Sequence, residues 1–588
     1  MPPPRKRARS SESSNKAVPS VDNFRNWTVN EVHTFLSSKG LCDEANCLKR
    51  EEISGQNLLD LSKNDLKEIG ITTLGKRLNL QKILQEMQAK IKSRGADYKV
   101  FNDSIHGHIQ VHPLCIKIMD TLQFQRLRQI KQLGCCYYVF PGASHNRFEH
   151  SIGVSHLAGM LARTLKERQP ELNITPQDVL CVEIAGLCHD LGHGPFSHVF
   201  DGVFIPSIDP KSKWKHEEAS VKMFDYLIKE NNLKEQFYAH GLNDADMTFI
   251  KEQIYGPLDK EDKNKKYKGR PENKHFLYEI VANKRNGIDV DKWDYFARDC
   301  HMLGISNSFD YSRFMKFAKV MKVDGEFQIC TRDKEVGNLY DMFHTRNCLH
   351  RRAYQHKVNK IIETMIVEAL VLANDHLLIT GTNGKELKMS EAIHDMVAYT
   401  KMTDNILYEL LNTKDPKLQQ SRDIITNVLS RKLYKCIGQT SPKDDNPRAL
   451  IPEMKEELVG FQQEELAKLN SSDLVILVVD LNYGMGSANP IDFVRFYSKY
   501  DPEQATMVRK SEVSNMLPEK FSEQQIRVYC KLRDKESIDQ ATHCFVQWCE
   551  SKKYKPKFGN VEPEMTPFKP EPRPQAKQNG RSRTRLSL

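Results

Sequence analysis

The spacing of apolar residues predicts a small helical domain at residues 22–92. From Val29 to Leu36, apolar side chains recur at the interval of one helical face. Thr28 stands before them as an N-cap residue, and Glu31 follows three positions later, as in a capping box. Further short helical patterns continue to Met87 and end in a polar, basic linker. We therefore predict five short helices packed around one small core.

Residues 96–440 predict a much larger domain that is almost entirely helical. The exception is a hairpin in which two β-type segments, 317–322 and 326–331, flank Asp324-Gly325. Asp-Gly between such segments is a strong signal for a two-residue hairpin turn. A long helical pattern follows from 337 to 374. This domain is large enough to hold a binding site within its own core.

The C-terminal third predicts a small α+β lobe at 461–551, after a polar, proline-containing stretch at 441–460 that we expect to be a flexible insertion. The lobe's predicted strands are 474–483 and 491–499, and its predicted helices are 517–531 and 537–551.

Both ends of the chain, 1–21 and 552–588, are rich in Pro, Lys and Arg and are expected to be disordered. The cluster Arg5-Lys6-Arg7-Ala8-Arg9 fits a nuclear import signal, and equally a solvated basic tail. Thr566, in Thr-Pro-Phe-Lys, fits a site for a proline-directed kinase of the cyclin-dependent type.

Composition indicates a soluble, intracellular protein. The chain has 588 residues, 39% hydrophobic and 28% charged, with a formal net charge of +10. No apolar run approaches the roughly 20 residues that a membrane span needs, and no secretory signal is visible. The fourteen cysteines include no C-x-x-C pair, which is typical of reduced thiols. The modest positive charge permits polyanionic ligands without requiring them.

The chemistry concentrates around His145, His150, His189, His193 and His198. The adjacent pair His189-Asp190 follows a helical pattern at 178–187 that is apolar on most sides, and a Gly-Pro turn ends that pattern. With His150 and Asp291, the pair makes a nitrogen and oxygen donor set that suits Fe, Mn, Zn or Mg. The alternative is a core histidine beside a helix-capping aspartate. Five histidines in so short a span favour the metal site.

Three residues of the 337–374 pattern stand four apart: Arg346, His350 and Tyr354. On an α-helix this spacing places them on one face. They form either a solvated charged face or a surface for a phosphorylated ligand. Their position in the same domain as the metal candidates favours the ligand-binding interpretation.

These motifs resemble those of a known family. His150, His189-Asp190 and Asp291 match the H…HD…D set of HD-domain phosphohydrolases, and residues 65–77 resemble the end of a sterile alpha motif (SAM) domain. Over nearly its whole length the chain is similar to the deoxynucleoside triphosphate triphosphohydrolases that join these two domains. Long runs carry the resemblance, at 137–150 and 333–346.

The resemblance implies hydrolysis of all four dNTPs to deoxynucleoside and inorganic triphosphate, with one transition metal (Fe, Zn or Mn) at the HD site and Mg²⁺ on the nucleotides. It implies that His198 or His216 is the general acid, oriented by Asp201 or Glu217, and the sequence does not choose between the two histidines. Leu133 and Tyr354 would crowd the sugar 2′ carbon, while Gln132 and Asp299 would hold the 3′ hydroxyl. The implied substrate contacts are Gln132, Leu133, Arg147, His193, Lys292, Tyr295, Asp299, Arg346, Tyr354 and Gln355.

The resemblance also implies regulation: GTP and dNTP bridge subunits and assemble an active homotetramer that limits the dNTP pool. The implied GTP-site residues are Lys99, Asp120, Gln125, Arg128 and Arg431. The implied dNTP-site residues are Val100, Asn102, Val139, Phe140, Arg313, Arg332, Lys334, Asn338, His356, Lys357, Val358, Lys435 and Lys499.

One departure from the family lies beside the sugar contacts, where Cys135-Cys136 replace residues that are often glycine. Two other functions compete with dNTP hydrolysis. The first is an HD phosphohydrolase acting on nucleoside monophosphates or cyclic nucleotides, which the cations Arg147, Lys292 and Arg346 disfavour. The second is a protein that binds single-stranded RNA or DNA through its basic tails.

Overall fold

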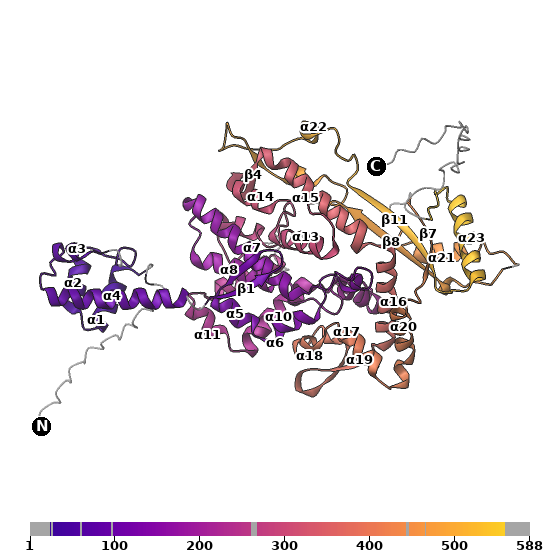
Figure 1. Ribbon diagram of the computed structural model, residues 1–588, viewed down its shortest axis with the longest axis horizontal. Helices are drawn as coiled ribbons and strands as arrows, with labels where there is room; N and C mark the ends of the chain where they lie inside the picture. The colour runs from indigo at the N-terminus through magenta and orange to yellow at the C-terminus, as the bar shows by residue number, and fades with distance from the viewer. Residues whose placement is uncertain are drawn as a thin grey trace, which may run out of the picture. The chain divides into compact units, whose positions relative to one another are not determined.

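The computed structural model describes residues 24, 27–58, 61–95, 98–259, 267–442, 446–464 and 466–558. The chain divides into two compact units, one formed by 1–429 with 483–518 and the other by 430–482 with 519–588. Helices predominate, and short strands supplement them (Figure 1). The basic cluster at 5–9 and Thr566 lie outside the described residues.

The N-terminal segment contains four α-helices and a turn at 55–58 within its described residues. Thr28 accepts a hydrogen bond from the Glu31 amide while Glu31 reaches back, so the predicted capping box forms. Trp27, Phe35 and Leu80 belong to the small buried core of this segment. The helices are α1 (Val29–Ser38), α2 (Cys42–Arg50), α3 (Lys63–Glu68) and α4 (Leu74–Gly95).

The large helical body surrounds two long helices, α7 (Arg147–Arg168) and α8 (Pro176–Cys188), which pack against each other. Most residues of both helices are buried, which agrees with the apolar pattern at 178–187. The other helices are α5 (Pro113–Met119), α6 (Leu122–Gln125), α9 (Ile205–Ile208), α10 (His216–Glu230), α11 (Lys234–Ala239), α12 (Asp244–Tyr255), α13 (Val290–Leu303), α14 (Tyr311–Phe317), α15 (Val336–Leu349), α16 (Lys357–Ala373), α17 (Met389–Ala392), α18 (Met396–Lys401), α19 (Ile406–Asn412), α20 (Gln419–Leu429) and α22 (Lys510–Val513).

The long helix predicted at 337–374 is interrupted. Residues His350–Tyr354 form a π-helical turn between α15 and α16, and α16 begins after His356 as its N-cap. A π turn widens the helix by about one residue per turn, which changes the direction of the following side chains. The prediction of one unbroken helix was wrong at this point.

Short strands at the margin of this unit form three small sheets. The predicted hairpin at Asp324-Gly325 is present as β3 (Lys319–Val323) and β4 (Glu326–Arg332). In the predicted strand 491–499, only two residues form a strand, and they pair in parallel with β4. The remaining strands are β1 (Lys99–Asp103), β2 (Gly107–Val111), β5 (Leu378–Thr380), β6 (Glu386–Lys388), β9 (Phe496–Tyr497) and β10 (Ala505–Thr506).

The second unit is a three-stranded antiparallel sheet, β7 (Lys435–Thr440), β11 (Ser522–Cys530) and β8 (Leu474–Asn482), with helices α21 (Ile451–Val459) and α23 (Lys535–Ser551). Strand β8 and helix α23 follow the sequence prediction. The helix predicted at 517–531 is wrong, because this segment contains the central strand β11.

The boundaries of this unit also differ from the expected lobe at 461–551. Strand β7 pairs with β11, so the unit begins before 461, whereas 483–518 belongs to the first unit. The stretch 441–460, expected to be a flexible insertion, contains α21, in which Met454 and Leu458 are buried. These two side chains give the stretch its place in the core of the lobe.

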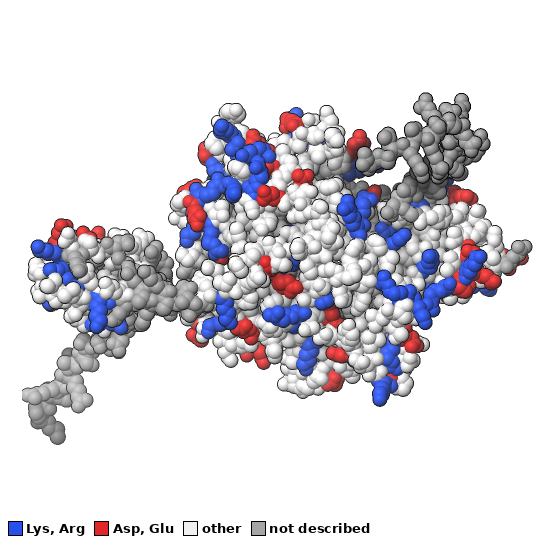
Figure 2. Space-filling model, viewed as in Figure 1, with Lys and Arg blue, Asp and Glu red and all other residues white. Residues whose placement is uncertain are grey.

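All fourteen cysteines are free thiols, as expected from their spacing. Within the described part of the chain, no helix combines the length and the apolar character that a membrane span requires. On the face shown in Figure 2, Lys and Arg side chains gather in several separate groups with Asp and Glu between them.

Candidate metal centre and cavity

Three helix ends bring the four predicted metal ligands together. His150 lies in the first turn of α7, and the pair His189-Asp190 follows the last turn of α8. Asp291 lies in the first turn of α13, whose N-cap is Asp289. Helix α7 packs against both α8 and α13, so all three ends meet at one place.

The donor atoms of these residues lie close to one another. The Nε2 atoms of His150 and His189 are 3.2 Å apart. Asp291 Oδ1 lies 3.1 Å from the first and 3.4 Å from the second. Asp190 approaches the same two nitrogens at 3.5 and 3.3 Å. Side-chain nitrogens and carboxylate oxygens therefore face a common centre.

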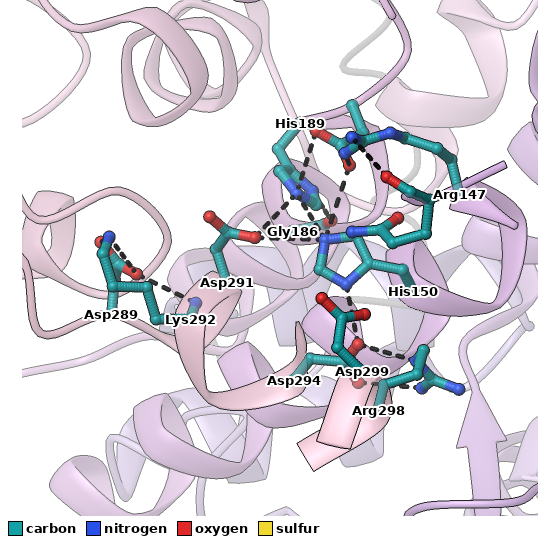
Figure 3. Close-up of polar contacts among 12 residues, drawn as sticks. Arg147, His150, Gly186, His189, Asp289, Asp291, Lys292, Asp294, Arg298 and Asp299 are labelled. Atoms are coloured by element: carbon teal, nitrogen blue, oxygen red, sulfur yellow. Dashed lines mark hydrogen bonds and ion pairs between the residues drawn. The ribbon is translucent and has the colours of Figure 1, made fainter. Parts of the chain in front are cut away.

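A second layer fixes the orientation of both rings, as Figure 3 shows. His150 turns its Nδ1 to Asp294 Oδ2 at 2.7 Å, and His189 turns its Nδ1 to the Gly186 carbonyl, also at 2.7 Å. Asp294 is itself held by Arg298 through two bonds of 2.9 Å. Such contacts are the usual means of presenting Nε2 of a histidine to a metal.

Electrostatics favour a positive charge at the centre. Burial would lower the pKa of His150, but the carboxylates of Asp291 and Asp294 raise it to about 10. Burial would likewise raise the pKa of Asp190, but Arg147 and the neighbouring histidines hold it well below its usual range. The carboxylates are therefore ionised at neutral pH.

The donor set fits a divalent metal. Ligands about 2.0–2.2 Å from one ion lie about 3–3.5 Å from each other, and the separations of 3.1–3.5 Å match this range. His150 and Asp190 are buried, while the Asp291 side chain is 31% exposed toward the cavity. The site therefore joins a rigid interior to a face that a substrate can reach.

His150, His189, Asp190 and Asp291 are called the donor cluster below. A cavity of about 590 Å³ opens over this cluster. Every substrate contact implied by the sequence lines it: Gln132, Leu133, Arg147, His193, Lys292, Tyr295, Asp299, Arg346, Tyr354 and Gln355. Arg346, His350 and Tyr354, which stand four apart in the sequence, all line the cavity.

Carboxylates hold two cations of the cavity, Arg147 and Lys292. Arg147 donates to Asp190 at 2.5 Å and to Ser197 Oγ at 2.9 Å. Lys292 lies 3.0 Å from Asp289. Burial and Arg346 lower the pKa of His350 to about 3, so this ring is neutral at pH 7. The cavity thus offers fixed positive charge and neutral imidazole to an anionic ligand.

Both candidate general acids line the cavity and share one carboxylate. His216 Nδ1 lies 2.7 Å from Asp201 and 3.5 Å from Glu217, and its ring stacks on His193 at 3.9 Å. His198 Nδ1 lies 3.6 Å from Asp201 and its side chain is 71% exposed. Burial would raise the pKa of Asp201, but its bonds to the two histidines hold it well below its usual range.

The far end of the cavity carries hydroxyl and carboxylate groups. Tyr354 donates to Asp299 at 2.5 Å, and His145 contacts the other oxygen of Asp299 at 2.7 Å. Leu133 lines this region together with Cys136, whose thiol is buried. Cys135 and Cys136 therefore fill volume beside the implied sugar contacts.

The implied regulatory residues fall in several small groups. Lys99 and Asp120 form an exposed ion pair at 3.7 Å, and Arg128 donates to Gln125 at 2.8 Å. The rings of Phe140 and His356 lie 5.8 Å apart.

Other members of the implied dNTP set have partners of their own. Arg313 pairs with Glu335 at 2.8 Å, Asn338 bonds to Asp310, Lys334 lies over the Phe317 ring, and Arg332 lies over the Tyr497 ring. Val100 and Asn102 belong to β1, and Lys357 and Val358 begin α16. Arg431 and Lys435 belong to the second unit.

Several residues of the site were not found from the sequence. Asp294 orients His150, and Asp289 pairs with Lys292 in the cavity wall. Asp289, Asp291 and Asp294 occur within six residues, and this acidic spacing was a usable signal for them. Lys360 and Glu363, which also line the cavity, gave no such signal.

Comparison with known proteins extends these observations. Residues 147–299 match the HD domain family, and residues 24–88 match the SAM domain (sterile alpha motif) family. The deoxynucleoside triphosphate triphosphohydrolase SAMHD1 of Xenopus laevis is 53% identical over 567 residues, which cover 93% of this chain and 89% of that protein. The protein of that name from Homo sapiens is 53% identical over 560 residues, with the same coverage.

A more distant relative shows how far the similarity extends. The SAMHD1 homolog of Dictyostelium discoideum is 39% identical over 447 residues, which cover 76% of this chain and 80% of that protein. With such identity over most of the length of all three relatives, the chain belongs to the family of deoxynucleoside triphosphate triphosphohydrolases that join a SAM domain to an HD domain.

Proposed function

We propose that this chain hydrolyses dNTPs to deoxynucleoside and inorganic triphosphate in the cavity over the donor cluster. The observation that carries the proposal is the combination of four converging metal donors with Arg147, Lys292 and Arg346 in one cavity. A monophosphate carries too few oxygens, over too short a span, to contact all three of these cations. A triphosphate has enough charge to engage all three.

The reaction adds water to the α-phosphorus and breaks its bond to the 5′ oxygen. A metal at His150, His189, Asp190 and Asp291, which we propose to be Fe, Zn or Mn, would polarise the phosphoryl group and lower the pKa of a bound water. Arg147, Lys292 and Arg346 would bind the phosphates, accompanied by Mg²⁺, and would stabilise charge as it shifts toward the leaving group. His198 or His216 would deliver the proton that the 5′ oxygen needs.

Selection of deoxyribose would be steric. Leu133 and Tyr354 line the cavity on the side where Asp299 accepts the Tyr354 hydroxyl bond. A rigid tyrosine ring held by a buried carboxylate leaves little freedom to admit a 2′ hydroxyl. Gln132 and Asp299 would hold the 3′ hydroxyl.

We also propose that GTP and dNTP activate the enzyme by assembling a homotetramer, which would let it limit the dNTP pool. The exposed Lys99–Asp120 pair supports a site for a guanine nucleotide, because the carboxylate can accept from the guanine edge while the ammonium meets phosphate. The Phe140–His356 ring pair offers a surface for the neighbouring nucleotide.

Nuclear import through Arg5–Arg9 and phosphorylation of Thr566 by a cyclin-dependent kinase remain proposals, as does binding of single-stranded RNA or DNA. The +10 net charge supports the last of these. Binding of single-stranded RNA or DNA would show an affinity that falls steeply as the salt concentration rises.

A product assay tests the main proposal. The purified protein is given one dNTP, with and without GTP, and triphosphate, orthophosphate and nucleoside are resolved. Asp190→Ala should abolish turnover, whereas Asp375→Ala, which removes an exposed carboxylate paired with Lys388, should not. Release of triphosphate in the absence of GTP would support the proposed hydrolysis and refute activation by GTP. Orthophosphate as the product would favour another HD phosphohydrolase, and no turnover in a folded, metal-loaded sample would refute the enzyme.

A further inference from the structure

The loop between the metal ligands and His198 has an unusual backbone. Phe196 and Ser197 both adopt left-handed conformations, with φ of 58° and 57°. For residues other than glycine this conformation is strained and persists only where surrounding contacts hold it. Both residues line the cavity, and His198 follows directly. Contacts from residues outside the loop therefore hold this backbone conformation.

Asp404 supplies one of the fixing contacts from a distant part of the chain. Its Oδ1 accepts from the Phe196 amide at 2.6 Å, while its Oδ2 accepts from the Lys131 amide at 2.8 Å. Its own amide donates to the Gln129 carbonyl at 3.0 Å. Lys131 directly precedes the implied sugar contacts Gln132 and Leu133. One carboxylate thus ties two walls of the cavity to each other.

Other contacts join the same two walls to each other and to Arg147. Ser197 Oγ donates to the Lys131 carbonyl at 2.6 Å and accepts from Arg147 Nε at 2.9 Å. A Cβ on Gly134 would lie 2.5 Å from the Phe196 carbonyl, so the two loops are in close contact. A shift of either loop therefore moves Arg147, His198 or the sugar contacts.

We propose that Asp404 is a positioning residue that sets the spacing between the wall carrying His198 and the wall carrying Gln132 and Leu133. It is not among the residues that line the cavity, so it acts through the loops and not on the substrate. The inference rests on the proposed function, since it assigns a role within that reaction.

A carboxylate is needed at position 404 because it must accept hydrogen bonds from two backbone N–H groups at once. Asp404→Asn keeps the shape but offers one oxygen and one donating amide group, so one backbone N–H would face another donor. Burial raises the pKa of Asp404 to about 6, against the effect of its bonds from Phe196 and Lys131. The ionised form, which accepts both bonds, therefore prevails at pH 7.5.

The test compares Asp404→Asn with Asp395→Asn. Asp395 also accepts backbone amides, from Val397 at 2.9 Å, Ala398 at 3.1 Å and Thr382 at 2.9 Å, and it lies outside the cavity lining. Asp395→Asn therefore controls for replacing a carboxylate that accepts backbone amides. Only Asp404→Asn should lower kcat for triphosphate release, at least tenfold, with KM within threefold of the unchanged protein and with equal metal content.

Several results would overturn the proposal: a kcat for Asp404→Asn within threefold of the unchanged protein, a kcat loss shared equally by Asp395→Asn, or a change in KM alone. If Asp404→Asn does not fold, Asp404→Glu replaces it. This variant keeps the charge and both acceptors but displaces them by one methylene group, so the same loss of kcat is expected and an unchanged kcat refutes the proposal.

Failure of the proposed function gives a different result, because the unchanged protein would then release no triphosphate. In that case a crystal structure of Asp404→Asn decides. Unchanged left-handed conformations at Phe196 and Ser197, with the same separation between the Phe196 and Lys131 amides, would overturn the positioning role.

Discussion

Removing the carboxylate behind His150 should weaken metal binding without touching a ligand. Asp294 is fully buried and receives four bonds, from His150 and His106 at 2.7 Å each and twice from Arg298 at 2.9 Å. In Asp294→Asn, one orientation of the amide keeps the oxygen toward His150 but turns its NH₂ group to Arg298. The other orientation turns the NH₂ group to His150 Nδ1 and favours the tautomer with its proton on Nε2, the metal-facing atom.

Either orientation has a cost that can be estimated. Loss of a second-layer partner typically lowers metal affinity about 10–100-fold, which is about 1.4–2.8 kcal/mol. Breaking a buried ion pair costs about 3–5 kcal/mol of folding free energy. Asp103 also pairs with Arg298, at 2.9 Å, so we expect the lower end of that range.

The assay separates the two effects. Metal affinity is measured by competition with a chelator, and the free energy of unfolding is measured by denaturant on the metal-free protein. Asp178→Asn is the matched control, because Asp178 is equally buried and paired, with Arg270 at 2.7 Å and Lys274 at 2.5 Å, but lies outside the donor cluster. The control should lose stability alone. A metal affinity within threefold of the unchanged protein in Asp294→Asn would refute the reasoning.

Three further predictions concern pH, the general acid and sugar selection. Burial raises the pKa of Glu279 to about 6, so the folded state holds its proton more tightly than the unfolded state does. Glu279 should therefore contribute a fall of about 2 kcal/mol in unfolding free energy as pH rises from 4 to 7, and the change over this range in Glu279→Gln should differ from that of the unchanged protein by this amount. His198→Asn and His216→Asn should both slow dNTP hydrolysis. The variant that lacks the general acid should regain most of its rate on an analogue with a p-nitrophenol leaving group. If each variant loses the same fraction of its rate on both substrates, neither histidine is the general acid. Leu133→Ala should lower the ratio of dATP to ATP hydrolysis at least tenfold, as measured by triphosphate release, and an unchanged ratio would exclude Leu133 from sugar selection.

Local signals in the sequence predicted many elements of the fold. The capping box at Thr28, the hairpin at Asp324-Gly325 and the apolar strand β8 each depend on a few neighbouring residues, so the sequence alone carries the information. The segment at 517–531 was misassigned for the opposite reason. Strand β11 is the central strand of its sheet, and Ile526 to Cys530 are all buried, so no clear alternation marks it as a strand.

The donor cluster was accessible from sequence because its residues belong to short motifs that a known family shares. The contacts that support the donor cluster and the cavity walls could not be predicted from the sequence. His150 meets Asp294 across 144 positions, and Phe196 meets Asp404 across 208. Nothing in the composition near either aspartate shows which distant group it will accept, because that pairing is decided by how the helices pack.

The π turn at His350–Tyr354 has a consequence for how this cavity tolerates changes in chain length. A π turn is equivalent to one residue inserted into an α-helix, and one residue corresponds to about 100° of helical rotation. The wider π turn absorbs that rotation, so deleting Arg351 should restore a regular helix and leave Tyr354 and Arg346 close to their present relative orientation. Arg346 and Tyr354, the implied phosphate and sugar contacts, are thus carried by one helical segment that can lose a residue at its π turn and still present both side chains to the same cavity.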